Sequence, residues 1–136
     1  MAASDSPRRE RPLSPHLQVY RWQVQMVTSI LHRATGMALA VGLLAMVWGL
    51  VALAAGPERW TAFADCAGSM PGRIVLFGFS WALAYHLLTG ARHPVRGAGH
   101  GWSIPEFVRS SWISIIGSVL LVVVAWGIVL VRWGQA

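Results

Sequence analysis

Three long runs of apolar residues dominate the chain, at positions 36–55, 74–91 and 112–131. Neither the first nor the third run contains a charged residue, and the second is interrupted only by His86. A helix needs about 20 apolar residues to cross the roughly 30 Å of hydrocarbon in a bilayer. A soluble helical bundle would show polar faces at the helical period, and these runs show none. The pattern predicts an all-α membrane protein with three transmembrane helices, at about residues 34–55, 74–93 and 111–132.

The segments outside these runs are short and rich in turn-forming residues. Residues 56–72 contain Gly-Pro and Pro-Gly pairs, and residues 93–109 contain several glycines and two prolines. Neither connection is large enough to bury a core of its own, so we expect both to be loops. The chain divides into an N-terminal segment, 1–28, and a membrane-anchor domain, 29–136. The N-terminal segment lacks the basic, apolar, small-residue order of a signal peptide.

Composition supports the membrane class and excludes two others. Charged residues make up 12% of the 136-residue chain, which is about half the fraction usual in soluble domains. The formal net charge is +6, carried entirely by arginine because the chain has no lysine. The arginines lie beside apolar runs rather than along a basic stripe with aromatic residues, so nucleic acid is not an expected partner. The single cysteine, Cys66, allows neither an internal disulfide nor a metal cage built from thiolates.

The distribution of arginine predicts how the chain crosses the membrane. Cytoplasmic segments of membrane proteins carry an excess of arginine and lysine. The N-terminal segment and the loop between spans two and three would therefore lie in the cytoplasm, or in the matrix of a mitochondrion. The eight arginines on that side are Arg8, Arg9, Arg11, Arg21, Arg33, Arg92, Arg96 and Arg109, and the three on the other side are Arg59, Arg73 and Arg132.

His86 is the first candidate functional residue, because an ionisable side chain inside a membrane span is costly and usually serves a function. Gly78, Ala82, His86 and Gly90 are spaced four residues apart and so share one helix face. Such a face of small residues allows the backbone of another helix to approach closely. It would equally allow a flat macrocycle to lie against the helix, with the imidazole aimed at its metal.

A second group of candidates stands at the entry to the first span. Ser29 and Arg33 are four residues apart on one helix face, and His32 lies on the adjacent face. An arginine at this depth often only extends its charge towards the lipid headgroups. Together, however, these side chains offer hydrogen-bond donors beside an apolar wall, as a quinone headgroup or the propionates of a haem would require.

Three ordered motifs resemble those of the cytochrome b membrane-anchor subunit of succinate dehydrogenase, respiratory complex II. Residues 11–17 read Arg-Pro-Leu-Ser-Pro-His-Leu, and residues 29–36 match Ser-x-x-His-Arg-x-Thr-Gly at the start of the first span. Residues 86–93 match His-x-x-x-Gly-x-Arg-His at the end of the second span. The motifs cover residues 11–93, and the three-span topology extends the resemblance to the C-terminus.

The resemblance implies a role for each matching residue. His86 would be an axial ligand of haem b, with the second ligand supplied by a companion anchor subunit. Ser29 and Arg33 would belong to the site at which ubiquinone is reduced, and His32 and Arg33 would contact the haem propionates. Arg92 and His93 would lie at the same membrane face, close to the haem edge and the iron-sulfur subunit.

The resemblance also implies partners and a location. The chain would be a subunit without a complete activity of its own, in a helical bundle that holds haem between subunits. Its partners would be a second membrane-anchor subunit, an iron-sulfur subunit, a flavoprotein subunit and membrane lipid. The bacterial inner membrane is favoured over the mitochondrial one, with the N-terminus in the cytoplasm.

One departure and two alternatives accompany this interpretation. The family usually has an aspartate within a few positions after Arg-His, whereas this chain continues with Pro94, Val95, Arg96 and Gly97. Because Pro94 disfavours helix in the residue before it, we expect the second span to end near His93. The same anchor could instead serve a fumarate reductase that oxidises quinol. A small scaffold or channel subunit without a cofactor, in which His86 only bonds between helices, is the alternative from another class.

Overall fold

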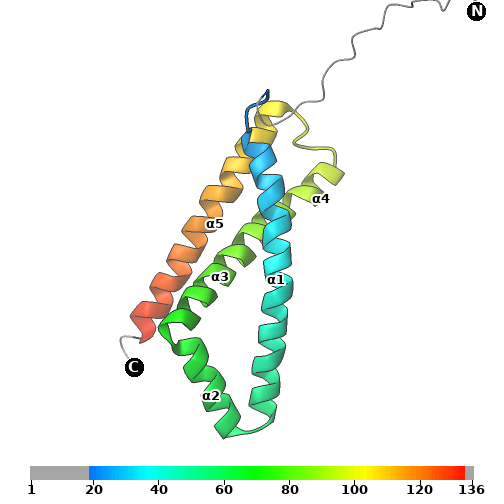
Figure 1. Ribbon diagram of the computed structural model, residues 1–136. Coiled ribbons are helices and arrows are strands. Elements are labelled where there is room, and N and C mark those ends of the chain that lie inside the picture. The colour runs from blue at the N-terminus through cyan, green and yellow to red at the C-terminus, as the bar shows by residue number, and fades with distance from the viewer. Residues whose placement is uncertain (1–18, 134–136) are drawn as a thin grey trace, which may run out of the picture.

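The computed structural model describes residues 19–133, which fold into five helices without a strand among them. Three are long: α1 (Val24–Ala54), α3 (Met70–Gly90) and α5 (Ile104–Trp133). The short helix α2 (Pro57–Gly68) connects α1 to α3, and the short helix α4 (Arg92–Gly97) follows α3 (Figure 1). The motif at residues 11–17, with Arg8, Arg9, Arg11 and the N-terminal segment up to residue 18, lies outside the described residues.

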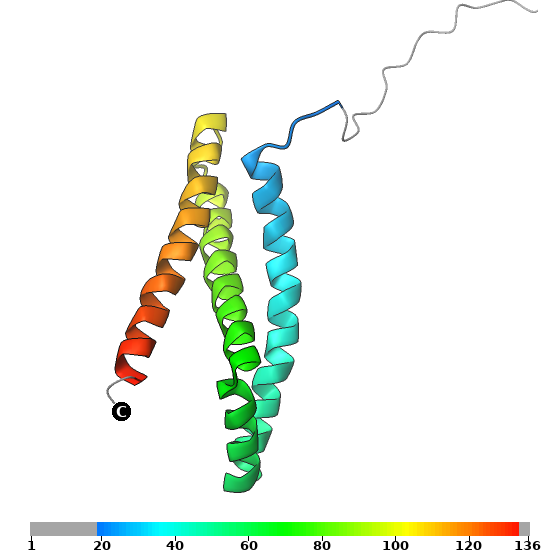
Figure 2. The ribbon, with the colours of Figure 1, turned by 60° about the vertical axis from the view of Figure 1, so that its left-hand side comes forward.

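Helix α3 is the central element, because it packs against both α1 and α5. The start of α1, the α3–α4 junction and the start of α5 lie at one end of the bundle, and α5 diverges from α1 towards the other end (Figure 2). Three segments are long and apolar enough to cross a membrane: Val24–Ala54, Met70–Gly97 and Ile104–Arg132. Each corresponds to one predicted span but begins earlier in the chain, and the first ends at Ala54 rather than at residue 55. This agreement confirms the all-α, three-span architecture.

The arginines lie at the two ends of the bundle in the two groups that the sequence indicates. Arg33, Arg92, Arg96 and Arg109 lie at the end of the bundle that contains α4, and Arg59 lies on α2 at the opposite end. The orientation of this bundle relative to the cytoplasm stays a prediction from the positive-inside rule.

The expectation that residues 56–72 form a loop is wrong, because twelve of them form α2. Gly56 has φ +112°, a conformation that strongly favours glycine, and Pro57 then occupies the first helical turn, where its missing N–H costs nothing. Phe63 of α2 packs edge-on against Trp48 of α1, with ring centroids 5.1 Å apart. The Ser69 hydroxyl accepts a hydrogen bond from the Gly72 amide at 3.2 Å and so caps α3.

The second span also ends differently from the prediction. Helix α3 stops at Gly90, and the chain re-forms a helix that includes His93 and Pro94. The expectation that residues 93–109 form a loop is therefore wrong as well, because α4 extends to Gly97 and α5 begins at Ile104. Pro94 has no amide proton to bond the Gly90 carbonyl, which interrupts the α3 hydrogen-bond pattern at that point. The same proline is tolerated in α4 because it lies in that helix's first turn. The interruption therefore falls three residues earlier than we expect from the sequence.

Small side chains allow α5 to approach α3 closely. Ser111, Ser114 and Ser118 are essentially inaccessible and recur at helical spacing. Each hydroxyl donates to a carbonyl of the preceding turn, at 2.9 Å, 3.0 Å and 2.8 Å respectively. Their own polar groups are thus satisfied within the helix, and the serines act as small packing residues. Most large apolar side chains point outwards instead, as at Leu44 and Leu120, which are 70% and 60% exposed.

Replacing Ser118 with leucine should weaken this packing. Ser118 is fully buried, so a larger side chain must displace a neighbour, at a cost of about 1–3 kcal/mol. We expect a lower thermal midpoint and a lower yield of assembled protein in mild detergent. Val119→Leu is the matched control, because Val119 is 47% exposed. Equal thermal midpoints for the two variants would contradict the assignment of this face to helix packing.

Candidate functional site

His86 lies on α3 and is held by the backbone of α1. Its Nδ1 atom is 3.2 Å from the His32 carbonyl oxygen and 3.3 Å from the Thr35 hydroxyl oxygen. The His32 ring stacks on the His86 ring, with centroids 4.0 Å apart and planes 15° from parallel. A Cβ atom on Gly36 would be 3.1 Å from the His86 Cε1 atom. Glycine at this position therefore leaves room for the imidazole against α1.

These contacts define which nitrogen of His86 carries the proton. The Thr35 hydroxyl donates to the carbonyls of Leu31 and His32, at 2.8 Å and 3.0 Å, so its oxygen is free to accept. The His32 carbonyl can only accept. Nδ1 thus faces two acceptors and must be the protonated nitrogen, which leaves the lone pair of the neutral ring on Nε2. A histidine arranged in this way is suited to bind a metal through Nε2.

The small-residue face around His86 is partly covered within the chain itself. Ala82 is 4% exposed, and a Cβ atom on Gly90 would be 3.8 Å from the His32 ring. Gly78, one turn before Ala82, is exposed, and a Cβ atom there would have no neighbour within 4 Å. The part of the face around Gly78 is therefore open to another molecule, whereas His86 and Gly90 are half-buried against α1.

A polar cavity of about 240 Å³ lies between α1, the α3–α4 junction and α5. It brings together five of the residues that the sequence singles out, because Ser29, His32, Arg33, Arg92 and His93 all line it. Both Ser29 and Arg33 are exposed, on the same side of α1. The structure places both within the first third of α1 rather than at its entry, because this helix begins at Val24.

Sequence reasoning does not identify several other residues that line this cavity. Gln25 precedes the motif at residues 29–36 by one helical turn, and Arg96 lies on α4 after the motif at residues 86–93. Thr89 lies within that second motif, and its side chain is buried. Only the helical spacing of Gln25 from Ser29 is a signal that the sequence could have provided. The placement of Arg96 depends on the break after Gly90, which brings α4 towards α1.

Several polar atoms around this cavity are buried and have no hydrogen-bond partner within residues 19–133. They include Gln25 Oε1, His32 Nδ1, Arg92 Nε and Arg96 Nη2. Buried polar groups in proteins are nearly always paired, so a group of unpaired ones indicates that a partner is supplied from outside the chain. The described residues that line the cavity include three arginines and no acid. The arginine nitrogens can only donate, so their missing partner is expected to accept hydrogen bonds and to tolerate, or carry, negative charge, whereas Gln25 Oε1 requires a donor.

Arg92 has partners other than the aspartate that is absent after His93. Its guanidinium donates to the Ser111 hydroxyl at 3.0 Å and to the Phe107 carbonyl at 3.4 Å. The His93 ring lies 5.8 Å from the His32 ring, measured between centroids. Both residues of the Arg-His pair thus face the cavity, and α5 supplies hydrogen-bond acceptors to the arginine.

A bare metal ion would find too few ligands here. Within the described part of the chain, no group of three or more histidine, cysteine or acidic side chains is placed to hold one. An iron atom bound by His86 would therefore need most of its ligands from elsewhere. A porphyrin with one further axial ligand from another chain meets that requirement, so the residues present fit a haem as the resemblance implies.

Comparison with known proteins gives a consistent family assignment. The family model of the succinate dehydrogenase/fumarate reductase transmembrane subunit matches residues 7–125. The succinate dehydrogenase cytochrome b556 subunit of Paracoccus denitrificans is 45% identical over 120 residues, which covers 88% of this chain and 92% of that protein. The corresponding subunit of Rickettsia conorii is 38% identical over 117 residues, covering 86% of this chain and 91% of that protein.

A mitochondrial relative shows the same similarity over a smaller share of its length. The succinate dehydrogenase cytochrome b560 subunit of Sus scrofa is 36% identical over 115 residues, which covers 81% of this chain and 66% of that protein.

Proposed function

Because the chain belongs to the family of succinate dehydrogenase/fumarate reductase transmembrane subunits, we propose that it binds haem b through His86 and forms part of the quinone-reduction site with Ser29 and Arg33. The chain is a membrane-anchor cytochrome b subunit of succinate dehydrogenase and does not itself carry the catalytic domain of this oxidoreductase. Three apolar helices and bacterial relatives support a multi-pass protein of the bacterial inner membrane.

The arrangement around His86 is the observation that carries the haem proposal. Two acceptors on α1 fix the proton on Nδ1, and Nε2 makes no such contact within residues 19–133. Contacts of this kind orient a metal-binding histidine and raise its basicity. Haem, when bound, would supply one-electron transfer to and from its iron. His86 would hold the haem iron, and a companion anchor subunit would supply a further ligand.

The polar cavity supports the quinone proposal. The Ser29 hydroxyl and the Arg33 guanidinium line it from α1 and can donate hydrogen bonds to a carbonyl oxygen of a ubiquinone headgroup. As electrons reach the quinone, negative charge develops on that oxygen, and the Arg33 charge stabilises it. The positive charge of Arg92 and Arg96 acts in the same direction, because their guanidiniums belong to the same cavity.

The positively charged arginines of this cavity can also bind the propionate carboxylates of haem. His32 and Arg33 would contact the propionates, and the nearby Arg92 and His93 would add donors at that edge. His32 stacks on His86, which places its unpaired Nδ1 atom close to the proposed iron ligand. An arginine-carboxylate bond is one of the stronger polar contacts available in a protein. The cavity thus has enough donors to hold a propionate and a quinone carbonyl at neighbouring positions.

The remaining partners follow from membership of the complex. A second membrane-anchor subunit would share the haem and cover the exposed apolar faces of the helices. An iron-sulfur subunit would deliver electrons from the flavoprotein subunit to the quinone at the end of the bundle that contains α4. The arginine distribution favours a cytoplasmic location for that end and for the N-terminus.

Purification of the protein from its own membranes in a mild detergent tests this function. We expect flavin-containing and iron-sulfur subunits to co-purify with it, together with a b-type absorbance that changes on reduction by dithionite. The relative amounts of haem, flavin and each subunit should be constant across the elution peak. A colourless but fully assembled protein would instead support the cofactor-free scaffold.

A further inference from the structure

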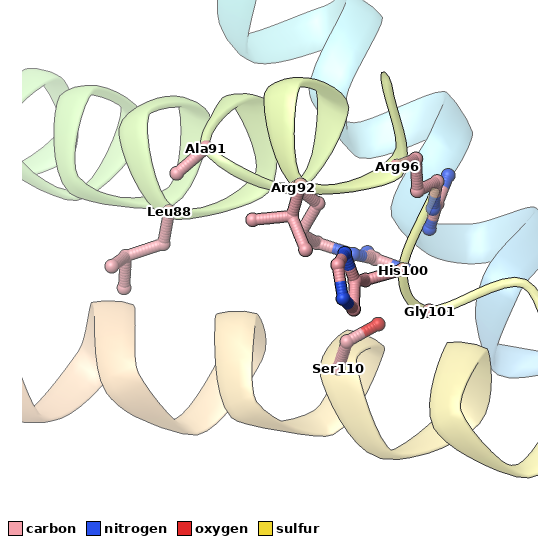
Figure 3. Close-up of a pocket in the computed structure, with 8 residues that line it drawn as sticks. Leu88, Ala91, Arg92, Arg96, His100, Gly101 and Ser110 are labelled. Atoms are coloured by element: carbon pink, nitrogen blue, oxygen red, sulfur yellow. The ribbon is translucent and has the colours of Figure 1, made fainter. Parts of the chain in front are cut away.

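A second cavity, of about 260 Å³, lies on the other side of α4 and faces α5 (Figure 3). One wall is apolar and is formed by Leu88, Ala91 and Val95. The opposite part contains Arg92, Arg96 and His100, and Ser110 of α5 closes it. This cavity shares Arg92 and Arg96 with the polar cavity beside α1, where their charge also faces the proposed quinone and propionates. It contains none of Ser29, His32, Arg33 and His86.

The charge of this second cavity is not balanced within its lining. Arg96 and Arg92 lie over the same Phe107 ring, with guanidinium carbons 3.9 Å and 4.9 Å from its centroid. No acidic residue is among the described residues that line the cavity. Glu106, the acid nearest along α5, accepts hydrogen bonds from the Ser103 hydroxyl at 2.6 Å and the Ser103 amide at 3.3 Å. The cavity therefore favours an anionic occupant.

The position of the cavity suggests which anion this is. Leu88 and Ala91 of its apolar wall precede Arg92 and Arg96 along the chain, so they lie nearer the centre of the span than the two arginines do. Trp102, beside the cavity, is 70% exposed, and its indole nitrogen donates to the Arg96 carbonyl at 3.1 Å. Exposed tryptophans with a fixed polar end are typical of the headgroup level of a bilayer. The cationic and apolar parts thus match the order of phosphate and acyl chain in a phospholipid.

We propose that this second cavity binds an anionic phospholipid, with its phosphate among Arg92, Arg96 and His100 and its acyl region against Leu88, Ala91 and Val95. Guanidiniums bind phosphate oxygens through charged hydrogen bonds, and basic pockets at the cytoplasmic face of membrane proteins attract anionic headgroups. A carboxylate from a soluble subunit would neutralise the arginines but leave the apolar wall uncovered. Free inorganic phosphate would do the same.

The test uses the assembled succinate dehydrogenase complex with His100→Glu, which places a negative charge at the proposed phosphate site. His100 is exposed and has no role in the proposed quinone or haem site. Ala98→Glu is the matched control, because Ala98 is exposed in the same loop but does not line the cavity. A second variant, Ser110→Leu, fills the cavity without changing its charge.

Phospholipid retained after extensive detergent washing is measured by mass spectrometry, per mole of complex. We expect His100→Glu and Ser110→Leu each to retain half or less of the tightly bound anionic phospholipid, whereas Ala98→Glu retains the wild-type amount. Phosphatidylcholine should not replace the lost lipid, and excess inorganic phosphate should not displace it from the wild type. Equal retention in all variants, displacement by inorganic phosphate, or a carboxylate of another subunit found in the cavity would each overturn the proposal.

Discussion

Replacing His86 with alanine is expected to abolish the b-type absorbance of the purified complex or to change it to a different spin state. The imidazole is the one side chain of this chain that we assign to the iron, and alanine offers no lone pair in its place. The helices should still assemble, because His86 is only partly buried and the buried residues of α3, Ala82, Ala84, Tyr85 and Thr89, are unchanged. The measurement is the dithionite-reduced spectrum, together with the haem-to-flavin ratio.

A second variant distinguishes ligation from packing. Thr35→Val keeps the shape of a side chain that is 4% exposed but removes the acceptor beside His86 Nδ1. Loss of such a supporting contact typically lowers metal affinity by about 10- to 100-fold, so haem should be lost more readily on dilution while the low-spin spectrum is retained. An unchanged low-spin spectrum in His86→Ala would refute the axial assignment, and His93 would be the next candidate.

Replacing Arg33 with leucine is expected to lower quinone reductase activity by about 10- to 100-fold. A buried quinone oxygen would lose a charged hydrogen-bond partner, a loss of roughly 1.5–3 kcal/mol. Succinate oxidation with a soluble dye as acceptor should stay close to wild type, because the flavin and the clusters belong to other subunits. Both activities are measured on the same preparation and divided by its flavin content.

Two comparisons make the result specific to the quinone site. Ser29→Ala should reduce quinone reductase activity less than Arg33→Leu, because a hydroxyl offers no charge as the oxyanion forms. Arg109→Gln removes an exposed arginine at the same end of the bundle that does not line the cavity, and it should leave this activity unchanged. Haem content is measured in each variant, because Arg33 also faces the proposed propionates. Wild-type quinone reduction in both cavity variants at matched assembly would place the site elsewhere, first in the companion anchor.

The sequence predicts the long helices because their signal is local. About 20 apolar residues without charge are typical of a membrane helix, and all three runs lie within such helices except for Ala55 at the end of the first. The helical face shared by Ser29 and Arg33 is predicted for the same reason. By contrast, the composition of residues 57–68 is too polar for a span, and its Gly-Pro start indicates only a turn. The α2 helix forms because Phe63 packs on Trp48 and Gly49 of α1, a contact between segments that sequence spacing does not reveal.

The candidate site is only partly predictable from the sequence for a related reason. His86, Ser29, His32 and Arg33 belong to motifs, but the contact between His86 Nδ1 and the His32 carbonyl joins residues 54 positions apart. Arg96 reaches the polar cavity only because α3 is interrupted before Pro94, and a continuous helix would direct it elsewhere. The unpaired polar atoms of Gln25 and Arg96 are a property of the packed chain, so no pattern along the sequence could show them.

The serine face of α5 has a consequence for the order in which this protein is made. Because Ser111, Ser114 and Ser118 bond to carbonyls of their own helix, α5 needs no partner helix to satisfy these hydroxyls in hydrocarbon. The helix can therefore leave the insertion machinery by itself, without a partner helix. It can then reside in the bilayer as an independent unit and dock on α3 afterwards. Docking then requires only that small side chains meet, so a late-synthesised third helix can join the first two without passing through an intermediate that exposes unbonded polar groups to lipid.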